Sequence, residues 1–364
     1  MRIAHVIDSM DVGGAETVVA ALCRLHAAAG HQVSVHCLFR GGAVAQRLET
    51  DGVPIFVDVP AAAGNLIRHL YREFRRVDPD VVHCHNKTAT VLAAPVARMA
   101  GVHAVVSTRH GMAAPPYRLR KDFKYWLCAA VFCSSVVAVC ETARRNMTRH
   151  ARRLAGRPVT IRNGAYPARS SSDQVVKNAD GFKLVTVGRL SAAKDYHVLL
   201  RSVAAALPRV PDLQLWIVGD GPEASSLKAC VADLGIEQSV QFFGEQATVG
   251  DWLSRADVFV LSSVSEGLPI SILEAMAAGL PAIVTDAGGM PEVLRLSGAG
   301  KVVPAGRVDL LARAIRDFAS RRRNLKELGD RARSCYLQHF LPERMAAEYL
   351  SLYRSCLTRE RAAI

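Results

Sequence analysis

The sequence contains no hydrophobic run long enough to cross a membrane. A membrane-spanning helix needs about 20 consecutive apolar residues, whereas the longest apolar stretch, residues 126–140, is interrupted by Ser134-Ser135. We therefore expect no transmembrane helix, and we predict a short helix followed by a buried strand over 136–139. The first apolar segment is short and ends at Asp8, which is typical of a strand and not of a signal peptide.

Paired cysteines are missing as well. The nine cysteines include no Cys-x-x-Cys pair, and an odd number without a framework predicts reduced thiols in a cytoplasmic protein. The string His83-Cys84-His85 is a candidate for metal binding. Alternation along a strand would place both histidines on one face and the cysteine on the other, so a metal site is the less favoured interpretation.

Acidic residues are scarce in the first half of the chain. Residues 1–165 contain 22 lysines and arginines against 11 acidic residues, and the segment from Arg109 to Arg162 contains 12 basic residues against two acidic ones. Such a basic face suits a nucleic acid, an anionic membrane or an acidic substrate. Because no nucleic-acid-binding motif accompanies the charge, we expect no nucleic-acid partner.

Internal repeats and low-complexity segments are also absent, and the chain instead alternates short apolar runs with helical patterns. This alternation predicts an α/β fold with a parallel sheet in each half. In the first half, the predicted strands cover residues 3–7, 33–38, 55–59, 81–85, 104–108 and 136–139, and helices include 15–29 and 65–77. In the second half, the predicted strands cover residues 182–188, 213–218, 240–243, 258–261 and 282–285.

The length of 364 residues favours two domains. A polar stretch over 168–173 is typical of a linker. We therefore predict an N-terminal domain over 1–165, a C-terminal domain over 166–340 and an amphipathic C-terminal helix within 341–364. In open α/β sheets, ligands bind beyond the carboxyl ends of the strands, so we expect the two domains to face each other across a cleft.

Glu266 and Glu274, eight residues apart, enclose the most informative stretch of the chain. A buried strand over 258–261 precedes it, and Pro269 is well tolerated only in the first turn of a helix. The pattern predicts a strand, a tight turn and a helix that ends near Gly279. The helix N-terminus suits a phosphate and the two carboxylates suit sugar hydroxyls, a combination that indicates a nucleotide sugar.

These motifs, taken in order, resemble glycosyltransferase family 4, a retaining family with the two-domain GT-B fold. The resemblance extends over nearly the whole chain. In the second half it is carried by Val187-Gly188-Arg189-Leu190 with Lys194, and by residues 217–223, 243–244, 266–274, 277–281 and 288–292. In the first half it is carried by Gly13-Gly14-Ala15-Glu16, Arg109-His110-Gly111, Arg162-Asn163-Gly164 and residues 82–85. The resemblance implies two Rossmann-like domains facing across a cleft, with the C-terminal helix returning to the first domain.

The resemblance also implies roles for individual residues. Arg189 and Lys194 would meet the donor diphosphate, because fixed cations stabilise the charge that develops on the leaving group. Glu266 would approach the donor hexose, and His110 would lie beside the bond that breaks. Glu274 would hold the ribose hydroxyls. The remaining substrate-binding positions are Gly13, Gly14, Gly267, Leu268, Pro269 and Ile270.

Ordinary interpretations stand beside these roles. His110 also fits a hydrogen-bonded histidine at the end of a strand, and Gly13-Gly14 a common turn between a strand and a helix. Asp78-Pro79-Asp80 would suit a metal-dependent transferase, but its proline and its place before a strand predict a turn. We expect no cofactor and no catalytic metal. The implied mechanism is front-face retention, in which the acceptor attacks from the side that the diphosphate leaves.

The sequence thus predicts a hexosyltransferase that moves a sugar from a nucleoside-diphosphate donor to a glycan or lipid-linked acceptor in envelope or exopolysaccharide biosynthesis. The alternatives are a GT-B sugar-nucleotide 2-epimerase and a non-catalytic nucleotide-sugar-binding protein. The basic, aromatic segment over 116–126 suits an anionic membrane surface, although Trp126 equally suits a protein core. We expect a cytoplasmic protein, with peripheral contact on the inner face of the cell membrane as a hypothesis.

Overall fold

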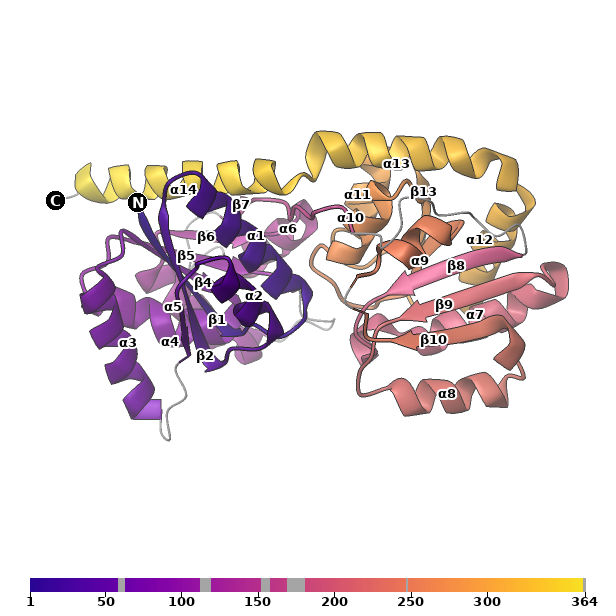
Figure 1. Ribbon diagram of the computed structural model, residues 1–364, viewed down its shortest axis with the longest axis horizontal. Coiled ribbons are helices and arrows are strands. Elements are labelled where there is room, and N and C mark those ends of the chain that lie inside the picture. Colours follow the sequence, from indigo (N-terminus) through magenta and orange to yellow (C-terminus); the bar gives the residue numbers. More distant parts are fainter. Residues whose placement is uncertain (58–62, 112–118, 152–157, 169–180, 247, 363–364) are drawn as a thin grey trace. The chain divides into compact units, whose positions relative to one another are not determined.

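The computed structural model describes residues 1–57, 63–111, 119–151, 158–168, 181–246 and 248–362 (Figure 1). It divides the chain into two compact units. The first unit comprises residues 1–164 together with 342–364, and the second comprises residues 165–341. Most of the predicted linker over 168–173 lies outside the described residues.

Among the described residues, the first unit contains a seven-stranded parallel sheet with the order β3-β2-β1-β4-β5-β6-β7. Its strands are β1 (Arg2–Ser9), β2 (Gln32–Arg40), β3 (Ile55–Val57), β4 (Val81–His85), β5 (Ala104–Arg109), β6 (Ser135–Ala138) and β7 (Val159–Thr160). Its helices are α1 (Gly14–Ala28), α2 (Ala43–Thr50), α3 (Ala63–Val77), α4 (Asn86–Met99), α5 (Leu119–Phe132), α6 (Glu141–Ala151) and α14 (Pro342–Ala362). The strand order reverses between β1 and β4, which is where such sheets bind ligands.

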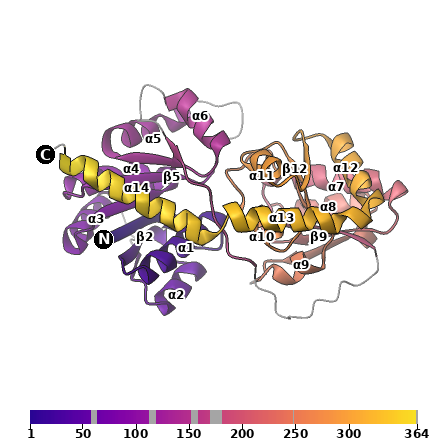
Figure 2. The same ribbon diagram turned by 90° about the horizontal axis from the view of Figure 1, so that it is seen from above.

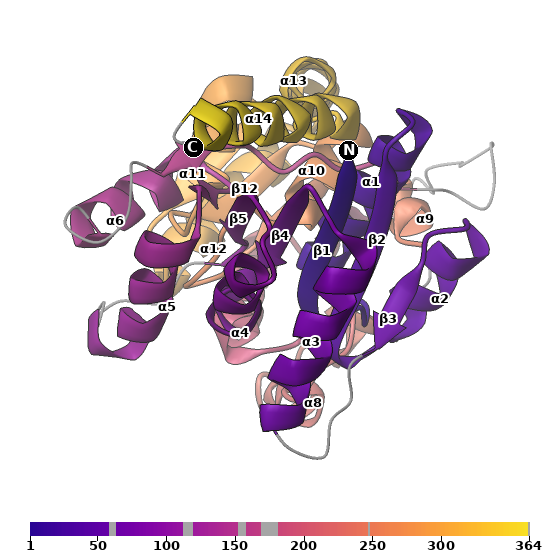
Figure 3. The ribbon, with the colours of Figure 1, turned by 90° about the vertical axis from the view of Figure 1, so that its left-hand side faces the viewer.

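The last helix of the chain belongs to the first unit. Figures 2 and 3 show α14 lying along this unit beside α1, and it also contacts β5. Tyr349 and Tyr353 of α14 are buried against the sheet. The Nε2 atom of His26, on α1, lies 3.1 Å from the carbonyl oxygen of Ala346. The C-terminal helix is therefore part of the hydrophobic core of the unit that begins the chain.

Within its described part, the second unit repeats the same plan with a six-stranded parallel sheet of order β10-β9-β8-β11-β12-β13. Its strands are β8 (Phe182–Val187), β9 (Leu213–Val218), β10 (Val240–Gly244), β11 (Val258–Leu261), β12 (Ala282–Thr285) and β13 (Gly300–Val303). Its helices are α7 (Tyr196–Ala206), α8 (Ala224–Asp233), α9 (Gly250–Arg255), α10 (Ile270–Ala277), α11 (Met290–Ser297), α12 (Val308–Ser320) and α13 (Leu325–His339). The strand order here reverses between β8 and β11.

Three sequence-based expectations can be compared directly with these elements. Pro269 is the N-cap of α10, so the helix begins one residue later than the predicted first turn. Asp78-Pro79-Asp80 connects α3 to the amino end of β4, where Arg2 pairs with Asp78 at 2.9 Å. This connection lies at the sheet edge opposite the carboxyl ends of the strands. In the described part of the chain, no helix is long and apolar enough to span a membrane.

Candidate active site

The loops that follow β8 and β9 are in close backbone contact, which glycines make possible. The Leu190 amide donates to the Asp220 carbonyl over 2.9 Å, and the Gly188 amide donates to the Val218 carbonyl over 3.0 Å. A Cβ placed on Gly219, whose φ is +135°, would come within 2.1 Å of the Gly188 carbonyl oxygen. Glycine therefore lets the two backbones touch, which gives a structural reason for two of the sequence motifs.

Lys194 ends η1 (Ala192–Lys194), the short 3-10 turn between β8 and α7. The loop after β11 holds its backbone, because the Ser262 hydroxyl donates to the carbonyls of Lys194 and Asp195, each at 2.9 Å. The Val264 amide donates to the carbonyl of Ala193 over 2.9 Å. The ends of β8 and β11 together fix the point from which the lysine side chain departs.

Lys194 and Glu266 form a close ion pair. Nζ of Lys194 lies 2.6 Å from Oε1 of Glu266, and the side chains are only 16% and 12% exposed. The Ser263 hydroxyl donates to the same carboxylate oxygen over 2.7 Å. The residues predicted to bind the diphosphate and the hexose are thus in direct contact. Charge-assisted contacts of this kind are strong and directional.

The turn after Glu266 is supported by Gly288-Gly289. The Gly289 amide donates to the Gly267 carbonyl over 2.7 Å. A Cβ on Gly288, whose φ is +56°, would come within 2.4 Å of the Glu266 carbonyl oxygen. Residues 267–270 are all buried and lead directly into α10. The predicted backbone positions therefore lie at the positive end of that helix dipole.

Glu274 lies four residues after the start of α10 and is partly buried. Burial raises the pKa of its carboxyl to about 7. An ionised carboxylate in such a place lacks the water that normally stabilises it. A carboxyl whose pKa is raised, on the helix that follows β11, is a candidate for accepting hydrogen bonds from ligand hydroxyls.

Arg189 differs from the other predicted residues of the second unit. Its side chain is exposed, and it forms no ion pair or hydrogen bond with the part of the chain that the structure describes. Ser262 and Ser263, in contrast, were not predicted although both hold site residues. Their position directly after β11 was the available signal, because polar residues at the carboxyl edge of a parallel strand often line a site.

Gly13 and Gly14 occupy the junction between β1 and α1. Gly13 is the N-cap of α1 in an extended conformation, and Gly14 is the first residue of the helix. The Thr17 hydroxyl donates to the Gly13 carbonyl over 2.8 Å, and a Cβ on Gly13 would come within 2.3 Å of Oε2 of Glu16. Glycine here makes room for a neighbouring side chain, so a role toward the donor stays a prediction.

His110 follows β5 at the carboxyl edge of the first sheet. Its Nε2 atom lies 2.9 Å from Nδ1 of His85, and Nε2 of His85 lies 3.0 Å from Nδ1 of His5. The His110 amide donates to Oδ1 of Asn86 over 3.0 Å. His5 and His85 are fully buried, whereas His110 is partly buried. The link to His5 was not predicted, because it joins residues 80 positions apart.

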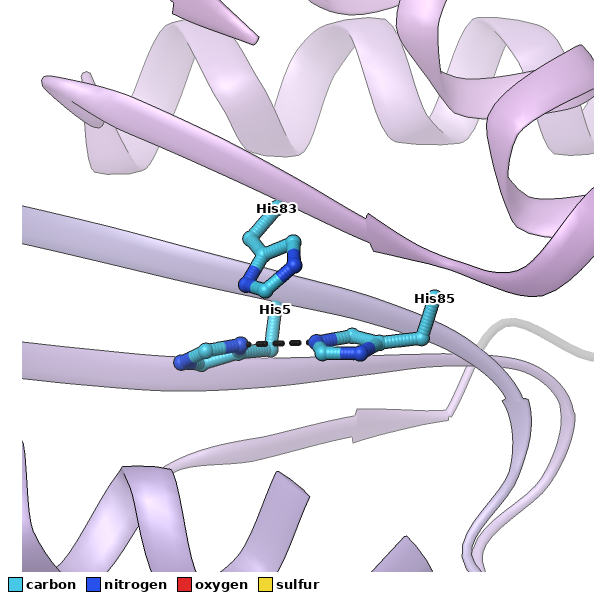
Figure 4. A group of neighbouring side chains, drawn as sticks. All are labelled: His5, His83 and His85. Atoms are coloured by element: carbon cyan, nitrogen blue, oxygen red, sulfur yellow. Dashed lines mark hydrogen bonds between the residues drawn. The ribbon is translucent and has the colours of Figure 1, made fainter. Parts of the chain in front are cut away.

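His5, His83 and His85 form a histidine cluster on one face of β1 and β4 (Figure 4). One nitrogen from each lies within 4.8 Å of the others, which is compatible with a metal ion. However, the nitrogens of His83 already pair with the Tyr353 and Thr108 hydroxyls, each at 2.7 Å. A metal would have to replace these hydrogen bonds, so the arrangement favours a hydrogen-bonded network. The absence of a catalytic metal stays a prediction.

Within the basic, aromatic segment over 116–126, the side chains that the structure describes are divided between core and surface. Residues 116–118 lie outside the described residues. Trp126 is buried and therefore belongs to the core. The Arg109 guanidinium lies over the indole ring, 5.9 Å from the ring centroid. Phe123 faces solvent and is 55% exposed.

The sequence matches two protein-family profiles that together cover most of the chain. Residues 12–169 match the profile described as Glycosyltransferase Family 4, and residues 168–334 match the profile described as Glycosyl transferases group 1. The chain belongs to glycosyltransferase family 4. This confirms the resemblance that the sequence motifs indicated.

Individual proteins similar to this glycosyltransferase include the putative glycosyltransferase EpsD of Bacillus subtilis (strain 168), which is 28% identical over 307 residues, 78% of this chain and 80% of EpsD. The UDP-Gal:alpha-D-GlcNAc-diphosphoundecaprenol alpha-1,3-galactosyltransferase of Escherichia coli is 28% identical over 265 residues, 68% of each protein. The crystal structure of Anabaena Alr3699/HepE in complex with UDP and glucose superimposes with a TM-score of 0.86 at 22% identity, over 98% of this chain and 100% of that one. The glycosyltransferase thus has the GT-B fold predicted from its sequence.

Proposed function

We propose that this glycosyltransferase moves a hexose from a nucleoside-diphosphate sugar to a hydroxyl of a glycan or lipid-linked acceptor, with retention of configuration, during surface polysaccharide assembly. The observation that carries the proposal is the Lys194–Glu266 pair, which lies where β8 and β11 end and α10 begins. A cation, a helix N-terminus and two carboxylates are the groups that an activated sugar requires.

Two similar proteins support this substrate class. The crystal structure of the Anabaena protein contains UDP and glucose, and the Escherichia coli protein is named for transfer from UDP-Gal to GlcNAc-diphosphoundecaprenol. UDP-sugars are therefore the first donors to test, and a sugar on a polyprenyl diphosphate is the first acceptor.

In the proposed mechanism, Lys194 stabilises the negative charge of the leaving group. The departing diphosphate gains negative charge as the glycosidic bond breaks, and a fixed cation with little access to water stabilises that charge strongly. Glu266, which pairs with Lys194, then accepts a hydrogen bond from a hydroxyl of the hexose. Glu274 accepts hydrogen bonds from the ribose hydroxyls. The exposed Arg189 supplies a second cation when the diphosphate binds.

Retention follows if the acceptor attacks from the face that the diphosphate leaves. A diphosphate oxygen takes the proton of the acceptor hydroxyl, and the new glycosidic bond forms as the old one breaks. His110 lies beside the sugar in this proposal. Protein cations and the α10 N-terminus neutralise the diphosphate, so we expect transfer to continue in EDTA.

The donor-site assignment can be tested in two steps. A thermal-shift panel of UDP-, GDP- and ADP-sugars identifies the donor, and release of the nucleoside diphosphate then measures turnover. Lys194→Ala and Glu274→Ala should each lower turnover by roughly 100-fold, the scale of losing one preorganised charged contact. Lys301→Ala, which removes an exposed lysine on β13, should leave turnover unchanged. Near-normal transfer by folded Lys194→Ala protein would reject the assignment.

The same assay separates the alternatives. A 2-epimerase would convert the donor sugar without any acceptor, and a non-catalytic protein would bind a donor without consuming it. Product release that depends on the acceptor, with retained configuration at the new linkage by NMR, supports transfer. An inverted linkage would contradict the front-face mechanism while leaving the transferase activity intact.

We further propose that α5 contacts an anionic membrane from which a lipid-linked acceptor is taken. Phe123, Leu127 and Val131 are 55%, 44% and 61% exposed and stand four residues apart, so they form an apolar stripe on one helix face. Lys124 is exposed beside them. Apolar side chains that insert and basic ones that attract anionic lipids together give peripheral binding.

Vesicle sedimentation tests this contact. Phe123→Ser/Leu127→Ser protein should lose binding to anionic vesicles, whereas Met99→Ser, which removes a side chain that is 70% exposed on α4, should bind normally. Equal binding of the unsubstituted protein to neutral and anionic vesicles at low salt would count against the proposal. So would unchanged binding by the double variant.

A further inference from the structure

Three imidazoles form a continuous hydrogen-bonded chain from the carboxyl edge of the first sheet into its core. We call His110, His85 and His5 the imidazole chain. Its two hydrogen bonds are 2.9 Å between His110 and His85, and 3.0 Å between His85 and His5. The nitrogen at each end, Nδ1 of His110 and Nε2 of His5, is buried and has no hydrogen-bond partner among the residues that the structure describes.

The members of the imidazole chain are neutral at physiological pH. Burial lowers the pKa of His5 to about 3 and that of His110 to about 4, and it holds the pKa of His85 well below its usual range. A neutral imidazole has one N–H donor and one bare nitrogen acceptor. Three rings therefore bring three N–H groups, and the two internal hydrogen bonds use two of them.

The remaining N–H group must stand at one end of the imidazole chain. If it were Nε2–H of His5, a donor would be enclosed in the core with no acceptor in the described part of the chain, and such orphaned N–H groups are rare. At the other end, Nδ1 of His110 belongs to a partly buried residue at the ligand-binding edge. A donor at this end can be satisfied by a ligand oxygen.

We propose that His85 and His5 are positioning residues that hold His110 as its Nδ1–H tautomer, so that His110 presents a hydrogen-bond donor to an oxygen of the donor sugar. His5 donates from Nδ1 to Nε2 of His85, and His85 donates from Nδ1 to Nε2 of His110. The part of this inference that concerns the sugar rests on the proposed function. The tautomer itself does not.

His83 provides an internal control, because it shares this core without belonging to the imidazole chain. Its ring centroid lies 4.0 Å from that of His85. Its nitrogens pair instead with the hydroxyls of Tyr353 and Thr108. Tyr353→Phe therefore removes a hydrogen bond from the same core and leaves the imidazole chain intact.

The tautomers can be read by NMR of the full chain labelled with ¹⁵N in its histidine rings, without any donor present. We expect all three members in the Nδ1–H form at neutral pH. His85→Leu should shift His110 toward the Nε2–H form that free imidazoles prefer. His5→Phe should cause the same shift from the other end of the imidazole chain. His85→Asn, whose side-chain amide can still donate to His110, should restore the Nδ1–H form. Tyr353→Phe should change nothing.

An Nε2–H form of His110 in the unsubstituted protein would overturn the proposal, and this measurement requires no variant to fold. An unchanged His110 tautomer in folded His85→Leu protein would overturn it as well. In the transfer assay, His85→Leu should lower kcat roughly 10- to 100-fold, with partial recovery in His85→Asn. A failure of the proposed donor chemistry would leave the NMR result unaffected, so the two failures are distinguishable.

Discussion

Glu274 is a carboxyl whose surroundings favour its neutral form, and this makes the stability of the second unit depend on pH. Its pKa is raised from 4.5 to about 7. Between these values the folded chain binds a proton that the unfolded chain releases, so stability is lost as the pH rises through about 7. The difference corresponds to at most about 3 kcal/mol.

We predict that Glu274→Gln stabilises the protein at about pH 8 by up to about 3 kcal/mol and has little effect near pH 5. Chemical unfolding at the two pH values measures the difference. Glu327→Gln, which changes an exposed glutamate on α13, serves as the control. An equal effect of Glu274→Gln at both pH values would show that this carboxyl is not the titrating group.

His36 makes the stability of the first unit depend on pH in the opposite direction. It is fully buried on β2, and its ring stacks on Phe56 with centroids 4.8 Å apart. Neither ring nitrogen has a hydrogen bond with any residue that the structure describes. Burial is the main reason that its pKa is lowered to about 4. The unfolded chain therefore gains a proton first as the pH falls below about 6.5, and stability is lost from there toward pH 4.

We expect His36→Leu to reduce the acid sensitivity of the first unit. The loss of stability between about pH 7 and pH 5 should be smaller in the variant by about 2 kcal/mol. Acid titration followed by the fluorescence of Trp126, in the same unit, measures this. His103→Leu is the control, because that exposed histidine precedes β5 at the surface. A parallel acid transition in the His36 variant would contradict the prediction.

At the scale of elements, the backbone contact between the loops after β8 and β9 depends on Gly219, because any side chain there would meet the Gly188 backbone. Gly219 and Gly235 both have positive φ, but a Cβ would meet the Gly188 backbone at Gly219 and nothing within 4 Å at Gly235. Gly235→Ala should therefore cost about 1 kcal/mol for the backbone conformation alone. Gly219→Ala should cost more than about 2 kcal/mol, because the steric contact is added.

Urea unfolding of the two variants compares these costs directly. Donor binding gives a second readout, because displacement of Gly188 also displaces Lys194, whose Cε atom would lie 3.3 Å from a Cβ on Gly188. Only Gly219→Ala should weaken it. Equal losses in both variants would mean that the loop contact is not tight.

Most elements followed from sequence pattern because their strands are buried on both faces and read as continuous apolar runs. Two strands were missed, β7 (Val159–Thr160) and β13 (Gly300–Val303), which lie at sheet edges. The first is only two residues long, and the second contains a glycine and an exposed lysine. Edge strands bury less apolar surface and therefore give a weaker periodic signal.

The candidate site was predictable only as a set of separate residues. Lys194 and Glu266 were identified from motifs, but their direct pairing depends on the crossing of two loops 72 positions apart. The hydrogen bonds of His5 to the rest of the imidazole chain depend on the register of β1 against β4, which places His5 opposite His83. Neither contact is local in sequence, and local periodicity carries no information about it.

At the scale of the whole molecule, the chain begins and ends in the same unit. The α14 helix contributes two tyrosines to the core of this unit. The hydroxyl of Tyr353 is hydrogen-bonded to Nδ1 of His83 at 2.7 Å, and that of Tyr349 lies 2.9 Å from the Thr108 hydroxyl. The helix over Pro342–Ala362 is therefore needed to complete a core whose strands are encoded at the start. The return of this helix was implied by family resemblance, because an amphipathic pattern alone does not name its partner.

Two buried tyrosines allow the units to be destabilised one at a time. Tyr353, 0% exposed, belongs to the core of the first unit, and Tyr336, 1% exposed, donates to the Ala165 carbonyl over 2.7 Å within the second. Replacing a buried aromatic residue with alanine costs about 3 kcal/mol or more. We predict that Tyr353→Ala raises amide hydrogen exchange across β1, β4 and β5, although the substitution lies near the end of the chain. Tyr336→Ala should instead raise exchange in the second unit, and equal exchange in both units for either variant would mean that they unfold as one.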